Sequence, residues 1–160
     1  PEWIDFPREG NNWSYHHARR LWSLRDNPEL QYHRLAEFDK AMISVIKQAD
    51  IFEDPIVYKH YSHVEDQLLV FSRGGLLFLF SLNGQRDFHN YKVKAPVGKY
   101  SIVLASDDAA FGGPNRLGTE LTFSVQGSKK QAKSKEDKMI ESDVEVFFPA
   151  RTAYVMKKVG

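Results

Sequence analysis

The first twenty residues hold the side chains best suited to binding a ligand. They read PEWIDFPREGNNWSYHHARR and place three aromatic rings, Trp3, Phe6 and Trp13, beside an Asp5/Arg8 pair and a Gly-Asn-Asn turn. Aromatic rings offer flat apolar faces, and Asp, Asn and Arg side chains donate or accept hydrogen bonds. Because the first residues of a domain are usually frayed and plain, this density marks the stretch as a candidate binding region.

Metal chemistry finds little support elsewhere in the chain. His60 and His63 lie three residues apart in a predicted strand, where they would point to opposite faces, and His16 and His17 are about 100 degrees apart on a predicted helix. The chain has no cysteine to add a thiolate ligand. We therefore predict no metal site.

Nucleophilic and phosphate chemistry are equally unsupported. Ser14, Ser62 and Ser72 have no Gly-x-Ser-x-Gly setting, and Gly112-Gly113-Pro114 has a proline where a phosphate loop needs amide donors. The adjacent carboxylates Asp107-Asp108 and Glu136-Asp137 read as ordinary surface charge. The sequence thus predicts no catalytic residue and no cofactor in this chain.

Composition favours no charged macromolecule as a partner. The 22 basic and 21 acidic residues leave a net charge of +1, so we expect neither nucleic acid nor an anionic membrane. The longest apolar run, Leu76 to Phe80, is far shorter than the roughly 20 residues that span a bilayer, and no signal peptide opens the chain. The absence of cysteine is compatible with a reducing compartment, and we expect a cytoplasmic location.

Two helices are predicted to follow the opening stretch. Ser14 is a possible N-cap for a short helix from Tyr15 to about Leu24, and Asn27-Pro28-Glu29 resembles the start of a second helix that covers 28–48. Six apolar residues of the second helix recur at helical spacing: Leu35, Phe38, Met42, Val45, Ile46 and Ala49. This stripe must be covered, either by other parts of a larger protein or by a second copy in self-association.

Beyond Pro55 the apolar period changes from helical to two. Strands are predicted at 56–61, 67–73 and 76–82, with Gly74-Gly75 as a tight hairpin turn and the all-apolar run from Leu76 as a central strand. Tyr91 to Val93 and Tyr100 to Leu104 are predicted to pair with each other, and three more strands follow around 121–125, 144–148 and 153–156. Between them, 127–138 is lysine-rich and is predicted to be a solvated hairpin tip.

The fold class predicted is mainly β. About eight short strands with close turn signals indicate an antiparallel, Greek-key-like β-sandwich over 56–160, preceded by a helical segment over 1–50, with 50–55 as the linker.

Three separated blocks resemble one known family. PEWIDFPREGNN with SYHHARRLWSLRDNPELQY, GKYSIVLASDD with FGGPNRL, and FPARTA are similar, in order and spacing, to segments of the glycogen and starch branching enzymes of the alpha-amylase superfamily, glycoside hydrolase family 13. Ala105 and Gly118-Thr119 depart from the family pattern, in which Asp and Asp-His are usual. We expect these departures to fall on loops.

The resemblance implies that the chain is a C-terminal fragment of such an enzyme. The helical segment would be the end of a (β/α)8 barrel, and the sandwich would be the all-β domain that follows it. The catalytic carboxylates would lie upstream of Pro1, so the fragment would be inactive alone, and its partners would be the upstream barrel and α-glucan. Substrate sites of such barrels are built from loops after the strands, which makes six opening residues candidates for glucan binding: Trp3, Asp5, Phe6, Arg8, Asn11 and Asn12.

Other interpretations stay open. The tryptophans could be core residues that hold the opening loop to the barrel, and Asp5-Arg8 could be a structural ion pair. The sandwich could be a separate carbohydrate-binding module that uses Tyr58, Tyr61, Tyr91 or Phe111 as a sugar platform. A third possibility is an interaction domain in which the amphipathic helix binds a partner.

Overall fold

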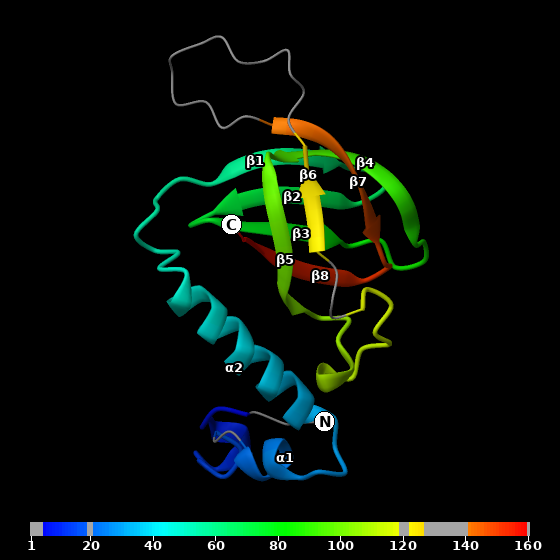
Figure 1. Cartoon of the computed structure of the whole chain (residues 1–160). Coiled ribbons are helices and arrows are strands. Elements are labelled where there is room, and N and C mark those ends of the chain that lie inside the picture. Colours follow the sequence, from blue (N-terminus) through cyan, green and yellow to red (C-terminus); the bar gives the residue numbers. More distant parts are fainter. Residues whose placement is uncertain (1–4, 19–20, 119–121, 127–140, 160) are drawn as a thin grey trace.

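The computed structural model describes residues 5–18, 21–118, 122–126 and 141–159, and in these it contains two antiparallel sheets and a helical segment (Figure 1). The first sheet has the order β1-β2-β3-β8-β5-β6, and β4 pairs with β7 in the second. The strands are β1 Tyr58–His63, β2 Leu68–Arg73, β3 Leu76–Ser81, β4 Phe88–Pro96, β5 Gly98–Ala105, β6 Thr122–Val125, β7 Glu141–Phe148 and β8 Thr152–Lys158. The mainly β, antiparallel prediction is confirmed.

The main core lies between the two sheets. Val70, Leu77 and Leu79 from the larger sheet meet Val93 and Phe148 from the smaller one, and all five are almost fully buried. The period-two pattern produces this directly, because in β2 the inward residues are buried and the alternate ones are half-exposed. Gly74 and Gly75 both have positive φ, at 55° and 74°, as the two-residue turn requires, and β3 is an interior strand of its sheet as predicted.

One predicted pairing is wrong. β4 and β5 do not pair with each other, because β4 pairs with β7 and β5 lies between β8 and β6. The chain changes sheets at Pro96-Val97, where the proline has no N–H to donate to a ladder. The Tyr100 hydroxyl donates to the Pro96 carbonyl oxygen at 2.9 Å and so holds this corner. Likewise β6 and β7 are in different sheets, so no hairpin joins them, and the predicted tip at 127–138 lies outside the described residues.

The helical predictions were partly wrong in extent. The structure has a 3₁₀ turn η1 at Glu9–Asn11, a short helix α1 at Trp22–Asp26 and a long helix α2 at Tyr32–Gln48. Tyr15 does not begin a helix in the described residues, because 15–18 form a single turn in which the Ala18 amide donates to the Tyr15 carbonyl at 3.1 Å. The Ser14 hydroxyl accepts from the His16 amide at 3.2 Å at the start of this turn. The Asn27 side chain accepts from the Glu29 amide, and this closes a turn five residues before α2 begins.

Helix α2 packs against the outer face of the six-stranded sheet. Phe38, Met42 and Ile46 of the predicted stripe contact a second cluster that contains Leu76, Leu104 and Val155. The period-3.6 pattern therefore located the covered face correctly. Leu35 is the exception, because it lies beyond the sheet and is 67% exposed.

A buried ion pair organises the loop after β5. The Asp107 side chain is completely buried and accepts from Arg116 Nε and Nη2, at 2.9 and 2.8 Å, and from the Leu117 amide at 3.0 Å. Arg116 also donates to the Thr152 hydroxyl and the Ala150 carbonyl at the start of β8. The prediction that Asp107 is ordinary surface charge was wrong.

The same loop holds α2 to the sandwich. The short 3₁₀ helix η2, Ala109–Phe111, places the Phe111 ring edge-on to Phe38, with 5.3 Å between centroids. The Arg34 side chain crosses the bare backbone of Gly112, where an added Cβ would be 2.5 Å from a guanidinium nitrogen. A loop anchored by Asp107 and Arg116 thus fixes the helix that follows the candidate binding stretch.

Candidate functional site

The described part of the opening stretch is a compact turn built around Asp5. Arg8 donates to the two carboxylate oxygens of Asp5 through Nε and Nη2, each at 3.2 Å, and the Asn11 amide donates to Asp5 at 3.2 Å and to the Phe6 carbonyl at 3.0 Å. The Arg8 backbone amide in turn donates to Asn11 Oδ1 at 2.9 Å. Three candidate residues, Asp5, Arg8 and Asn11, are therefore brought together, and they contact one another directly.

Their mutual contacts favour a positioning role. The Asp5 backbone amide also donates to the His17 carbonyl at 3.0 Å, which brings the end of the stretch back to its start. Asn12 and Trp13 adopt positive φ, 52° and 56°, so the chain reverses where the Gly-Asn-Asn sequence predicted a turn. The structural ion pair, one of the two interpretations left open by the sequence, is present, and Arg8 keeps a partly exposed guanidinium.

Two aromatic rings of the opening stretch are exposed in this chain. Phe6 is 73% exposed and Trp13 is 66% exposed, so neither is buried within this chain. Trp3 lies outside the described residues. The rings thus remain available to whatever lies against this turn, and Phe6 projects beside the Asp5 cluster.

The pKa of Asp5 is held below its ordinary value, chiefly by the hydrogen bonds from Arg8 and with a further contribution from Asn11. Since the folded-state pKa lies below the unfolded one, the turn is fully stabilised above about pH 4 and loses this contribution as pH falls through the lower folded value. We expect a carboxyl-detected NMR titration of Asp5 to show this depressed pKa, with the Asn11 amide signals shifting at the same pH. In Arg8→Gln the pKa of Asp5 should rise. Titration of Asp5 at an unshifted value in the wild type would contradict the cluster.

A groove that sequence reasoning missed lies between α1 and α2. It encloses about 450 Å³ and is lined by Trp22, Tyr32 and Leu35 with the charged Arg25 and Asp39. All three apolar side chains are exposed. The groove forms because the chain reverses direction at Asn27 to Leu30, between the two helices. No pattern in the sequence predicts this change of direction.

A buried polar chain was also missed. His60 Nδ1 contacts the Glu141 carboxylate, and His60 Nε2 is 2.7 Å from the Ser72 hydroxyl, with the His60 side chain almost fully buried. His63 lies 3.1 Å from Asp66, whereas His60 contacts Glu141 and Ser72. The register shift between Lys59 and Tyr61 places His63 opposite buried Leu68, on the face where His60 meets Ser72, so the prediction that the two histidines point to opposite faces was wrong. Glu141 is 81 positions from His60, a separation that no spacing argument could bridge. The three side chains tie β1 and β2 to β7 of the opposite sheet.

Most aromatics of the proposed sugar platform are occupied. The Tyr61 and Tyr91 rings pack edge to face and their hydroxyl oxygens are 3.1 Å apart, the Tyr91 hydroxyl donates to Asp66, and Phe111 packs on Phe38. Tyr58 lines a cavity of about 410 Å³, and one of about 220 Å³ is lined in part by Phe111. Among the described residues, no three His, Asp or Glu side chains converge to hold a metal, and no helix has the length and apolar content to span a membrane.

These features define an all-β domain with a helical extension. The chain belongs to the family of alpha amylase C-terminal all-beta domains, whose model matches residues 58–159. It is 37% identical to a 1,4-alpha-glucan-branching enzyme of Rhizophagus irregularis and 38% identical to one of Dictyostelium discoideum, over 98% and 99% of this chain but 22% and 23% of those proteins. A chloroplastic/amyloplastic branching enzyme of Oryza sativa is 40% identical over 76% of the chain.

The chain therefore spans less than a quarter of the length of these relatives. The resemblance found in the three sequence blocks is confirmed, and the block around FGGPNRL is now explained as the Asp107–Arg116 loop.

Proposed function

We propose that the chain is the C-terminal accessory part of a 1,4-alpha-glucan branching enzyme, with the catalytic carboxylates in the remainder of that protein. The observation that carries this is the near-complete alignment of this chain with branching enzymes several times its length. On this proposal the fragment alone transfers no glucan chain, because a transferase needs its nucleophile and acid in one site. We propose the cytoplasm as its location, although the rice relative's name places that protein in plastids.

The sandwich would act as a support for the catalytic barrel. The exposed apolar groove of Trp22, Tyr32 and Leu35 suits a covering protein surface, and the upstream barrel is the occupant we propose. Self-association through the same face is the alternative, and it would appear in light scattering as a concentration-dependent dimer of the complete enzyme. The division into 1–50 and 56–160 fits this arrangement, with α2 fixed to the sheet by Phe111 and Arg34.

The opening turn would contribute to the glucan groove. Phe6 and Trp3 would present rings to the sugar, while Arg8, Asn11 and Asn12 offer donors and acceptors and Asp5 holds the turn together. The exposure of Phe6 and the mutual hydrogen bonds of Asp5, Arg8 and Asn11 support a preorganised turn of this kind.

We expect Trp3→Ala in the complete enzyme to lower branching turnover severalfold while the melting temperature changes by less than about 2 °C. One lost ring contact to substrate affects the rate without removing core packing. Tyr15→Ala is the matched control, since Tyr15 is an exposed aromatic of the same stretch and outside the proposed site. Unchanged turnover in Trp3→Ala would refute the groove assignment, and branching by the isolated 160-residue chain would refute the accessory role.

A further inference from the structure

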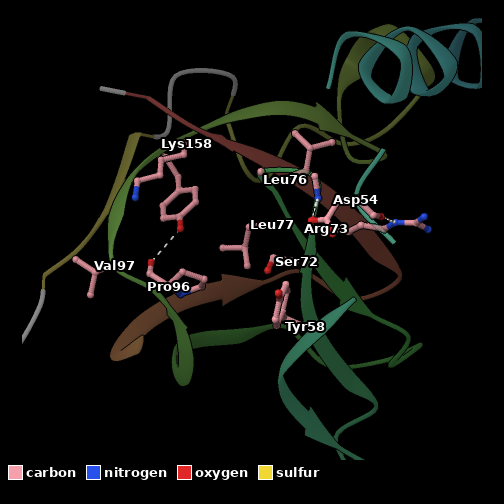
Figure 2. Close-up of a pocket in the computed structure, with 12 residues that line it drawn as sticks. Asp54, Tyr58, Ser72, Arg73, Leu76, Leu77, Pro96, Val97 and Lys158 are labelled. Carbon is pink, nitrogen blue, oxygen red and sulfur yellow. Dashed lines mark hydrogen bonds between the residues drawn. The ribbon is translucent and has the colours of Figure 1, made fainter. Parts of the chain in front are cut away.

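A second cavity lies at one end of the sandwich, far from the opening turn in the sequence and on other elements. It encloses about 410 Å³ and opens where the β2–β3 turn, the β4–β5 corner and the last residue of β8 meet (Figure 2). This volume falls within the range of small-molecule sites. Figure 2 shows Leu77 at the centre of the cavity, with Lys158 and Val97 on one side and Asp54 and Arg73 on the other.

The walls of this cavity are mainly apolar. Leu77, Pro96 and Val97 line it together with Tyr100, whose hydroxyl already donates to the Pro96 carbonyl. The phenol group of Tyr100 is therefore bonded within the protein, and only its ring is left to face a ligand. Such walls suit an apolar body and offer few partners for the many hydroxyl groups of a sugar.

The charged groups on the far side are already paired. Asp54 accepts from the Ile56 and Gly74 amides, which hold its pKa below the ordinary value, and Arg73 Nε donates to the Asp54 carbonyl oxygen at 2.8 Å. The Arg73 guanidinium also lies 5.8 Å from the centre of the Phe52 ring. These contacts fix the turn at Gly74, and Figure 2 shows the Arg73 guanidinium extending away from Leu77 at the centre of the cavity.

Lys158 differs from these groups. Its ammonium has no carboxylate partner in the part of the chain that the structure describes, and its stem crosses Gly98, where an added Cβ would lie 2.7 Å from Lys158 Cε. The missing side chain at Gly98 thus lets Lys158 fold over the cavity's edge. Lys157, its neighbour on β8, does not line the cavity, because adjacent strand residues point to opposite faces.

We propose that this cavity binds a small organic anion with a compact apolar body, such as a medium-chain carboxylate. The body would lie against Leu77, Pro96 and Val97, and the carboxylate would receive hydrogen bonds from the Lys158 ammonium. The site is independent of the proposed branching role, so either can fail without the other.

The test is a titration of the 160-residue chain with octanoate, followed by two-dimensional NMR. We expect saturable shifts of the amides of Gly74 and Gly75, which line the cavity, and of Gly98, which lies against the Lys158 side chain. Lys158→Gln should raise the dissociation constant for octanoate about fivefold at low salt, which is the effect of losing one partly exposed charge pair. Lys157→Gln should change this dissociation constant less than twofold. Octan-1-ol should bind equally to the wild type and Lys158→Gln, because it carries no charge.

A second variant tests the cavity without touching the charge. Val97→Trp should fill the cavity and abolish the amide shifts that octanoate causes. The amide signals of residues away from the cavity should keep the dispersion of the folded wild type. The proposal is wrong if octanoate causes no saturable shift of the Gly74, Gly75 and Gly98 amides. It is also wrong if Lys157→Gln weakens octanoate binding as much as Lys158→Gln does. If maltose shifts the same amides with higher affinity than octanoate, the ligand class is wrong.

Discussion

Replacing Arg116 with leucine should lower the free energy of unfolding by about 3–5 kcal/mol, the usual cost of leaving one partner of a buried ion pair alone. The Asp107 carboxylate would lose two charge-assisted hydrogen bonds in a place with no access to water, and the start of β8 would lose two more. Chemical denaturation of the chain, monitored by fluorescence and circular dichroism, measures the loss.

Two further variants separate the buried charge from general disturbance. Arg25→Leu is the matched control, because Arg25 pairs with Asp26 at the surface and should contribute about 0–1 kcal/mol. Asp107→Leu combined with Arg116→Leu should be less destabilised than the sum of the single variants, since no buried carboxylate is left unpaired and Asp87, which also pairs with Arg116 at 3.1 Å, is 39% exposed. Equal effects of Arg116→Leu and Arg25→Leu would contradict the role given to Asp107.

Gly113→Ala should lower the free energy of unfolding by about 3 kcal/mol through steric overlap alone. An added Cβ would lie 2.2 Å from the carbonyl carbon and oxygen of Asp107 and 2.6 Å from its Cα. These are backbone atoms of the residue that Arg116 holds, so they cannot move aside without breaking the ion pair.

Gly84→Ala is the matched control for this substitution. No heavy atom lies within 4 Å of a Cβ built at Gly84, so the change should stay within about 0.5 kcal/mol. The comparison is made by thermal and urea unfolding of both variants. Similar free energies of unfolding for Gly113→Ala and Gly84→Ala would show that the loop after β5 can rearrange to accept the added methyl group. That result would contradict the claim that the Asp107–Arg116 pair holds this loop rigid.

The sequence predicted the local features of the fold well. Strand positions, the Gly74-Gly75 hairpin and the covered face of α2 follow from periods of 2 and 3.6, which depend only on near neighbours. The pairing of β4 with β7 was missed because these strands are far apart in the sequence. The alternation of Tyr91 and Val93 indicates a strand but does not identify the strand that pairs with it. Asn27 misled the helix prediction because the side chains that cap helices also close turns.

The candidate site was predictable only in part. The sequence identified the residue types of the opening turn and the Asp5–Arg8 ion pair as one alternative, but not the bond from Asn11 that completes it. The Ser72–His60–Glu141 chain and the Asp107–Arg116 pair were missed for a common reason. Each depends on burial and on contacts between distant segments, and polar residues buried with a partner look like surface residues in a one-dimensional pattern.

The position of β8 has a consequence for how the molecule acquires its fold. Among the described residues β8 follows the other seven strands in sequence, yet it lies between β3 and β5 and forms ladders with both. Until it is in place, β3 and β5 each expose an unpaired apolar edge, the kind of surface that promotes aggregation. Closure of this sheet must therefore wait until β8 has left the ribosome, and a chain stalled before Thr152 would be a substrate for chaperones.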